Sequence, residues 1–103
     1  MSIESTERAS RGYAGDVTAV AVTLVSKPGC HLCDAARDVV TSVIGELGAE
    51  ASVSLDEISI FDDKALYDAY VEEIPVVLIN GKVHNIWRVD PTRLRNALVE
   101  AAA

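Results

Sequence analysis

The chain has 103 residues, of which 50% are hydrophobic, and this is enough to build one domain with its own core. Its 16 acidic and 9 basic residues give a formal net charge of −7, which repels phosphate backbones and anionic lipid headgroups, so nucleic acid and membrane surfaces are poor partner predictions. The two cysteines are too few for the disulfide framework of a small secreted protein, and we expect their role to be chemical reactivity.

The start of the chain predicts no folded element. Residues 1–16 are rich in Ser, Glu, Arg and Gly without periodicity, so we expect a flexible tail there and a single domain over residues 17–103. The apolar run 17–25 follows two arginines, as in a signal sequence, but acids precede it and nine residues cannot span a bilayer. We therefore expect a cytoplasmic protein, whose thiols are normally held reduced.

The first half of the domain predicts a strand, a helix and a second strand. Residues 17–25 carry no charge and fit a strand that is covered on both faces, and Lys27-Pro28-Gly29 then breaks it. From His31 onward apolar residues recur mostly three and four apart, which predicts an amphipathic helix that Gly48 can end. Residues 51–60 then alternate between apolar and polar and predict a second strand.

The second half predicts a short helix, a hairpin and a last helix. Asp62 and Asp63 can cap the short helix, and 76–79 is a buried strand. Asn80-Gly81 is the strongest short-range signal for a two-residue turn, here into a strand over 82–89. Asp90 and Pro91 suit the N-cap and first residue of the last helix. Its expected inner side is Leu94, Ala97, Leu98 and Ala101.

The predicted order is therefore β, α, β, α, β, β, α. With a βαβ unit followed by a hairpin, the natural packing is an α/β fold in which a four-stranded mixed sheet is flanked by three helices.

The cysteines form a Cys-x-x-Cys motif in the strand-to-helix turn of this βαβ unit. Cys30 should be the more exposed sulfur and should face the free N–H groups at the start of the helix, where the dipole favours thiolate over thiol. We predict that Cys30 is the nucleophile. Cys33 lies one turn deeper and can attack a mixed disulfide at Cys30, so we predict that Cys33 is the resolving thiol.

Two plainer interpretations compete with this one. The cysteines could be inert core residues, or half of a zinc site, because Cys-x-x-Cys is also zinc spacing. Zinc requires four ligands, and only His31 and His84 remain as further imidazoles, with His31 poorly placed between the two sulfurs. Redox exchange is favoured, and no metal site is predicted.

The sequence resembles glutaredoxin-like proteins of the thioredoxin superfamily, in particular short bacterial members with a Cys-His-Leu-Cys active site. The matched segments are Lys27-Pro28-Gly29-Cys30-His31-Leu32-Cys33, Glu73-Ile74-Pro75-Val76 and Leu78-Ile79-Asn80-Gly81-Lys82. The resemblance spans about Val17 to Ala101. It implies a thioredoxin-like fold with a cis Pro75 beside the sulfurs, and a backbone contact from Ile74 to a bound thiol peptide.

The resemblance also bears on the electron donor. Lys27 matches the basic residue that holds a glutathione carboxylate in glutaredoxins, and Asp90 can match their acid. The Gly-Gly pair that usually contacts glutathione is absent, and Trp87 and Arg88 stand there instead. The thioredoxin Trp-Cys-Gly-Pro-Cys motif is absent too, so the sequence selects neither glutathione nor thioredoxin reductase.

Other side chains keep two interpretations each. His31 could stabilise the Cys30 thiolate or be an exposed polar residue. Lys27 is favoured as an anion contact over a solvated loop charge. His84 is favoured as a surface or half-buried polar residue over a ligand, and Trp87 as a core residue over an exposed platform for a protein substrate.

The predicted function is dithiol exchange through Cys30 and Cys33 with protein or low-molecular-weight disulfides, as a thiol:disulfide oxidoreductase. No bound cofactor is expected, and an external thiol or a flavoprotein reductase would supply electrons to a monomer. The partners are disulfide-containing proteins or small thiols. The alternatives are an iron–sulfur-binding module, or a redox sensor without significant turnover.

Overall fold

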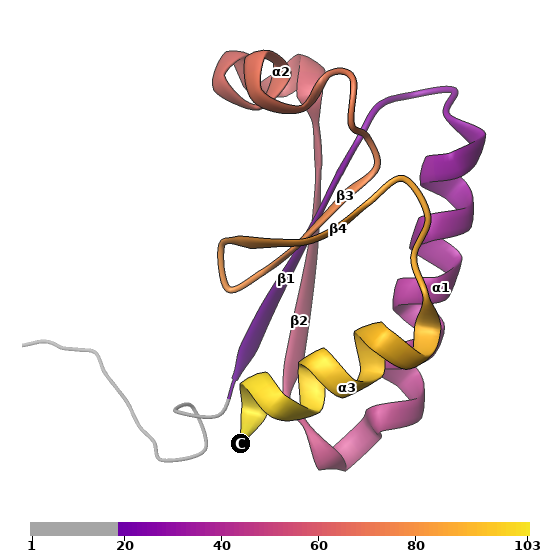
Figure 1. Ribbon diagram of the computed structural model, residues 1–103, viewed down its shortest axis with the longest axis vertical. Coiled ribbons are helices and arrows are strands. Elements are labelled where there is room, and N and C mark those ends of the chain that lie inside the picture. Colours follow the sequence, from indigo (N-terminus) through magenta and orange to yellow (C-terminus); the bar gives the residue numbers. More distant parts are fainter. Residues whose placement is uncertain (1–18) are drawn as a thin grey trace, which may run out of the picture.

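The computed structural model of the protein describes residues 19–103, so the expected tail over 1–16 and the first two residues of the expected first strand lie outside the described part. The helices and strands confirm the predicted order (Figure 1). They are β1 Val20–Ser26, α1 His31–Leu47, β2 Val53–Ser59, α2 Lys64–Tyr70, β3 Val76–Ile79, β4 Lys82–Ile86 and α3 Pro91–Ala102. Two short 3-10 turns, η2 Gly48–Glu50 and η3 Ile60–Asp62, follow α1 and β2.

The sheet has the strand order β2-β1-β3-β4, and it is mixed as predicted. β1 pairs in parallel with β2, while the β1–β3 and β3–β4 pairs are antiparallel. Helices α1 and α3 lie along one side of the sheet, and α2 lies at one end of the other side (Figure 1). Because β1 is central and free of charged residues, it can be buried between these layers.

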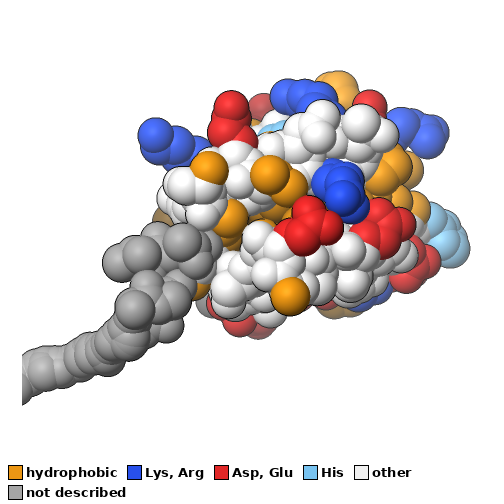
Figure 2. All heavy atoms as spheres, turned by 90° about the horizontal axis from the view of Figure 1, so that it is seen from below, with side chains coloured by type: hydrophobic (Ala, Val, Ile, Leu, Met, Phe, Trp, Pro, Cys, Tyr) orange, Lys and Arg blue, Asp and Glu red, His pale blue; other side chains and the backbone are white. Residues whose placement is uncertain are grey.

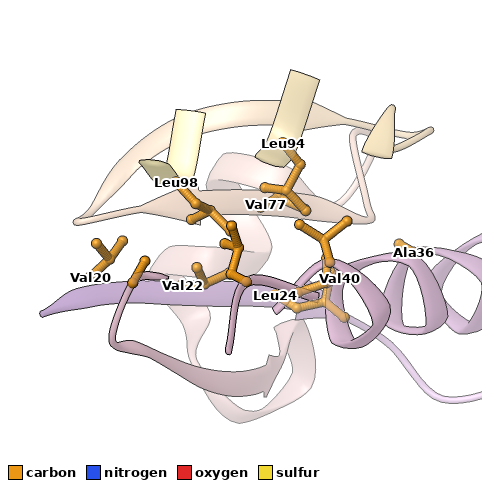
Figure 3. Close-up of a cluster of buried hydrophobic side chains, with 11 residues drawn as sticks. Val20, Val22, Leu24, Ala36, Val40, Val77, Leu94 and Leu98 are labelled. Atoms are coloured by element: carbon orange, nitrogen blue, oxygen red, sulfur yellow. The ribbon is translucent and has the colours of Figure 1, made fainter. Parts of the chain in front are cut away.

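Neighbouring residues of β1 serve two different cores, because successive side chains of a strand point to opposite faces. On the α1–α3 side, Leu24 and Val77 of the sheet pack against Val40 of α1 and Leu94 and Leu98 of α3 (Figure 3). On the other side, a second core contains Val25, Cys33, Ile60, Ile74 and Val76. One of the two cysteines is therefore part of the packed interior.

The turn between β3 and β4 follows the prediction. Asn80 and Gly81 have φ values of 52° and 83°, and the positive φ at both positions is what a type I′ hairpin turn requires. The Asn80 side chain also accepts a hydrogen bond of 2.9 Å from the Ala21 N–H, which ties the hairpin to β1.

Several predicted boundaries are wrong by a few residues. β2 begins at Val53 rather than at residue 51, and Ile60 already lies in η3. β4 ends at Ile86 and not at residue 89, because the next residue takes a positive φ that leaves the sheet. On α3, Ala101 is exposed, and its neighbour Ala102 packs against the core in its place.

Candidate redox site

Cys30 and Cys33 lie at the start of α1, where the sequence places them. Cys30 is the N-cap residue of the helix, with extended backbone angles, and its Sγ accepts a hydrogen bond of 3.1 Å from the Cys33 N–H. The two cysteines form a disulfide, with their Cα atoms 5.2 Å apart. A sulfur at this position faces the positive end of the helix dipole, which stabilises negative charge.

The two sulfurs differ in their exposure to solvent. Cys33 is fully buried, in contact with the second core, whereas Cys30 packs against that core from a partly exposed position. An incoming molecule can therefore reach Cys30 first. This is the asymmetry that attack at one sulfur and resolution by the other requires.

The segment before β3 packs in the same core as Cys33. The peptide bond between Ile74 and Pro75 is cis, and both residues are buried. Ile74 belongs to the same core as Cys33, so the structure brings these two predicted site residues together. The Pro75 carbonyl accepts a hydrogen bond of 2.8 Å from the Trp87 N–H, which joins this segment to the end of β4.

Lys27 and His31 flank the disulfide and are both exposed. Lys27 lines a hollow of about 360 Å³ together with Pro28, Gly29 and Arg37, whereas His31 is the first residue of α1. Their predicted roles as an anion contact and a thiolate partner stay predictions.

A charged cluster of Ser26, Glu57, Arg37 and Asp34 borders the same hollow. The Arg37 guanidinium donates two hydrogen bonds of 2.6 Å to Glu57 and one of 2.9 Å to Asp34. Buried Ser26 donates from its hydroxyl to Glu57 Oε2 at 2.7 Å. The hydrogen bonds from Arg37 hold the pKa of Glu57 below its usual value, with burial opposing and Ser26 assisting, and they raise the pKa of Arg37.

The structure uses Asp90 as a helix cap. Its Oδ1 accepts hydrogen bonds from the Thr92 and Arg93 N–H groups at 2.9 and 3.2 Å, so the predicted N-cap of α3 is confirmed. Asp90 is not a member of the core that contains the cysteine pair. Its predicted contact with a substrate stays a prediction.

The prediction that Trp87 belongs to the core is wrong. Trp87 is 53% exposed, and it has a φ of 66°, outside the strand β4. The indole N–H donates to the Glu72 carbonyl at 3.4 Å. His84 is half-buried, as favoured, and burial together with the charge of Arg93 lowers its pKa.

Arg37 and Glu57 are not among the site residues that the sequence predicts. The spacing of Asp34 and Arg37 on one helix could have indicated an ion pair. The partner on β2 could not be found without the strand register, which places Glu57 beside Leu24 of β1. Within residues 19–103, no group of three or more His, Cys, Asp or Glu side chains is placed to hold a metal ion.

The glutaredoxin-like domain family (DUF836) matches residues 21–99, which is most of the chain. The chain belongs to this family. A glutaredoxin-like protein of Dictyostelium discoideum is 25% identical over 75 residues, covering 71% of this chain and 69% of the relative. An uncharacterized protein of Mycobacterium tuberculosis is 29% identical over 75 residues, covering 72% of this chain and 77% of the relative.

Solved structures show that this glutaredoxin-like domain has the thioredoxin-like fold. A structural-genomics target from X. campestris is 30% identical, with a TM-score of 0.60 over 75% of this chain and 93% of the other. Oxidized mitochondrial thioredoxin 3 of Saccharomyces cerevisiae is 14% identical, with a TM-score of 0.56 over 79% and 77% of the two chains. The predicted family and fold are confirmed, and the cysteine pair supports a thiol redox role. Among the described helices, none has the length and hydropathy to cross a membrane.

Proposed function

We propose that this glutaredoxin-like domain is a thiol:disulfide oxidoreductase that works by a dithiol mechanism. The observation that carries the proposal is the unequal placement of a bonded cysteine pair at a helix N-terminus: Cys30 is reachable from solvent, and Cys33 is buried. A pair kept only for stability would gain nothing from one reachable sulfur. Exchange by successive attack needs one reachable sulfur and one protected sulfur.

In the proposed reaction the Cys30 thiolate attacks one sulfur of a substrate disulfide. The substrate bond breaks, a mixed disulfide with Cys30 forms, and the first substrate thiol leaves with a proton from solvent. The Cys33 thiol then loses its proton and attacks Cys30 Sγ, which releases the second substrate thiol and closes the internal disulfide. Two electrons pass to the substrate. Two equivalents of an external thiol, or a flavoprotein reductase, return the protein to its dithiol form.

The proposal requires no bound cofactor and is made for a monomer acting in the cytoplasm, where small thiols keep such pairs reduced. The start of α1 supports it, since the free N–H groups there favour the thiolate that must attack. Asp34 also lies in the first turn and would oppose a thiolate, but its carboxylate is bound by Arg37.

The test is equilibration of the full chain in buffers of graded thiol:disulfide ratio, followed by alkylation and intact mass. We expect both thiols to be lost and regained together in the natural chain. Cys33→Ser should accumulate a mixed disulfide with the buffer thiol, while the matched variant Cys30→Ser should form far less. Turnover of bis(2-hydroxyethyl) disulfide completes the test. Equal adducts on both variants would contradict the assigned roles, and reversible pairing without turnover would leave a sensor in place of an enzyme.

A further inference from the structure

A groove runs along α1 from a residue between the two cysteines. Its first part is a hollow of about 160 Å³ lined by Leu32, Ala35, Ala36 and Val39 of α1 and by Trp87, Arg88 and Val89, so its one charged side chain is basic. Its second part, of about 250 Å³, is lined by Asp38, Val39, Ser42, Val43, Glu46 and Pro91. Val39 borders both hollows, so they lie next to each other along α1, and we call them together the α1 groove.

The dimensions of the α1 groove suit an extended peptide. Leu32, Ala35, Val39, Ser42 and Glu46 line it at spacings of three and four, so they form one stripe along the helix. At a rise of ~1.5 Å per residue this stripe is about 21 Å long. An extended chain advances ~3.3 Å per residue, so the stripe matches about six residues of a bound segment.

The end of the groove nearest the disulfide is an exposed apolar contact held in a fixed place. Trp87 and Leu32 are 53% and 42% exposed. The Trp87 backbone N–H is bonded to the Pro75 carbonyl, and its indole N–H is bonded to the Glu72 carbonyl. Rigid, exposed tryptophan beside an aliphatic side chain is typical of the anchor points of protein interfaces. A bulky apolar side chain placed there would be buried against Leu32, which is two residues from Cys30 along the chain.

The far half of the groove is bordered by acidic side chains. Asp38 forms no ion pair with any residue of the described part, and Glu46 lies 3.7 Å from Arg95, which is equally far from Glu50. One arginine between two carboxylates leaves a net negative charge. Charge complementarity with Asp38 and Glu46 therefore favours a basic residue in the part of a bound segment that passes them. Figure 2 shows one end of the molecule, where acidic and basic side chains lie near one another among hydrophobic ones.

We propose that the α1 groove binds an extended segment of a protein disulfide substrate. The segment is about six residues long and carries a bulky apolar side chain beside its reacting cysteine and a basic residue farther along. This inference rests on the proposed function, because it names the substrate class for exchange at Cys30. A segment of this kind suits an apolar anchor and an acidic border better than a small anionic thiol does.

The test uses two cysteine peptides, each in a mixed disulfide with 2-mercaptoethanol. One carries Leu beside the cysteine and Lys four residues on, and the other carries Ser and Glu there. We expect kcat/KM to favour the Leu/Lys peptide by about tenfold, because its Leu is buried against Leu32 and Trp87 and its Lys faces Asp38 and Glu46. Trp87→Asn, which tolerates the positive φ, should remove the part of this preference that Leu supplies, and Asp38→Lys should remove the part that Lys supplies, about threefold each. Val83→Asn is the matched control, because Val83 is 52% exposed and lies outside the groove.

Turnover of bis(2-hydroxyethyl) disulfide separates this inference from the proposed function. It should change by less than about twofold in the control Val83→Asn, and in Trp87→Asn and Asp38→Lys it should fall less than turnover of the Leu/Lys peptide does. Equal kcat/KM for the two peptides, or an equal loss of both substrates in Trp87→Asn, would overturn the inference. If the natural chain reduces no disulfide, binding of the Leu/Lys peptide with Ser for Cys is followed by Trp87 fluorescence. A saturable change that Asp38→Lys weakens supports the groove. No change, or a change that depends only on protein concentration, overturns it.

Discussion

The charged cluster beside the redox loop predicts a measurable loss of stability when Glu57 is replaced. Glu57→Ala removes the only acceptor that the buried Ser26 hydroxyl has in the described structure, and it removes two hydrogen bonds from Arg37. A buried hydroxyl without a partner costs about 1–3 kcal/mol. The Arg37 pair adds about 0.2–1 kcal/mol, because both side chains are more than 30% exposed to solvent (38% and 33%).

We therefore expect Glu57→Ala to lower the free energy of unfolding by about 2 kcal/mol at pH 7, which corresponds to ~8–16 °C in Tm for a domain of this size. The free energy of unfolding is measured by urea unfolding, which is followed by far-UV circular dichroism. In the double-mutant cycle with Ser26→Ala, the coupling energy should be about 1 kcal/mol, because removing the hydroxyl removes the penalty. Asp68→Ala, which breaks the exposed pair with Lys64, is the control and should change stability by less than about 0.5 kcal/mol.

The same variant has a pH dependence of known sign. The folded pKa of Glu57 lies below its usual value of 4.5, so its stabilisation is complete above that pH and is lost as the pH falls through the folded pKa. The difference between Glu57→Ala and the natural chain should therefore shrink in acid. Additive losses in the cycle at pH 7, or a difference that does not change in acid, would refute the assigned contacts.

Three further predictions concern the rest of the domain. The pKa of His84 in the folded chain is lowered from 6.5, so the unfolded chain takes up the proton more readily as the pH falls through that region. The stability of His84→Leu relative to the natural chain should therefore increase as the pH falls from 7 to 5.5, with a slope below the ~1.4 kcal/mol per pH unit of one full proton. A stability difference that does not change with pH would contradict this prediction. Asp90→Ala should lower the free energy of unfolding in urea by about 1 kcal/mol because it removes the N-cap of α3, while Asp90→Asn should retain most of the capping stabilisation. Leu94→Ala should cost about 2–5 kcal/mol because Leu94 is fully buried, whereas exposed Val99→Ala should cost less than about 1 kcal/mol.

Local signals predicted the elements of this fold well because each has a local cause. Asn80-Gly81 supplies the two positive φ values of the hairpin, and Asp90-Pro91 supplies the cap and first residue of α3. The stripe that packs α1 on the sheet is also a local pattern, ending at Gly48. Such features depend on residues a few positions apart, and the sequence displays those directly.

The errors arise where a distant contact decides the outcome. Trp87 is of a residue type that is typical of cores, but its backbone N–H is hydrogen-bonded to the Pro75 carbonyl and its indole N–H to the Glu72 carbonyl. Both partners come from another part of the chain. Glu57 has the appearance of a solvated strand charge until the β1–β2 register sets it beside Leu24, from where its carboxylate accepts hydrogen bonds from Ser26 and Arg37. Neither contact could be derived before the strands were paired.

The placement of the cysteines links these contacts to the proposed chemistry. The β1–α1 loop is fixed at one end by Ser26, which is bound to Glu57, and at the other by the first turns of α1, which Arg37 joins to the same carboxylate. Cys30 lies between these two anchors, while Cys33 is packed in the second core. In the proposed reaction the reachable sulfur of Cys30 attacks first, and the buried sulfur of Cys33 acts once a mixed disulfide at Cys30 has brought a leaving group to it. The unequal burial of the two sulfurs supports this order of the two steps.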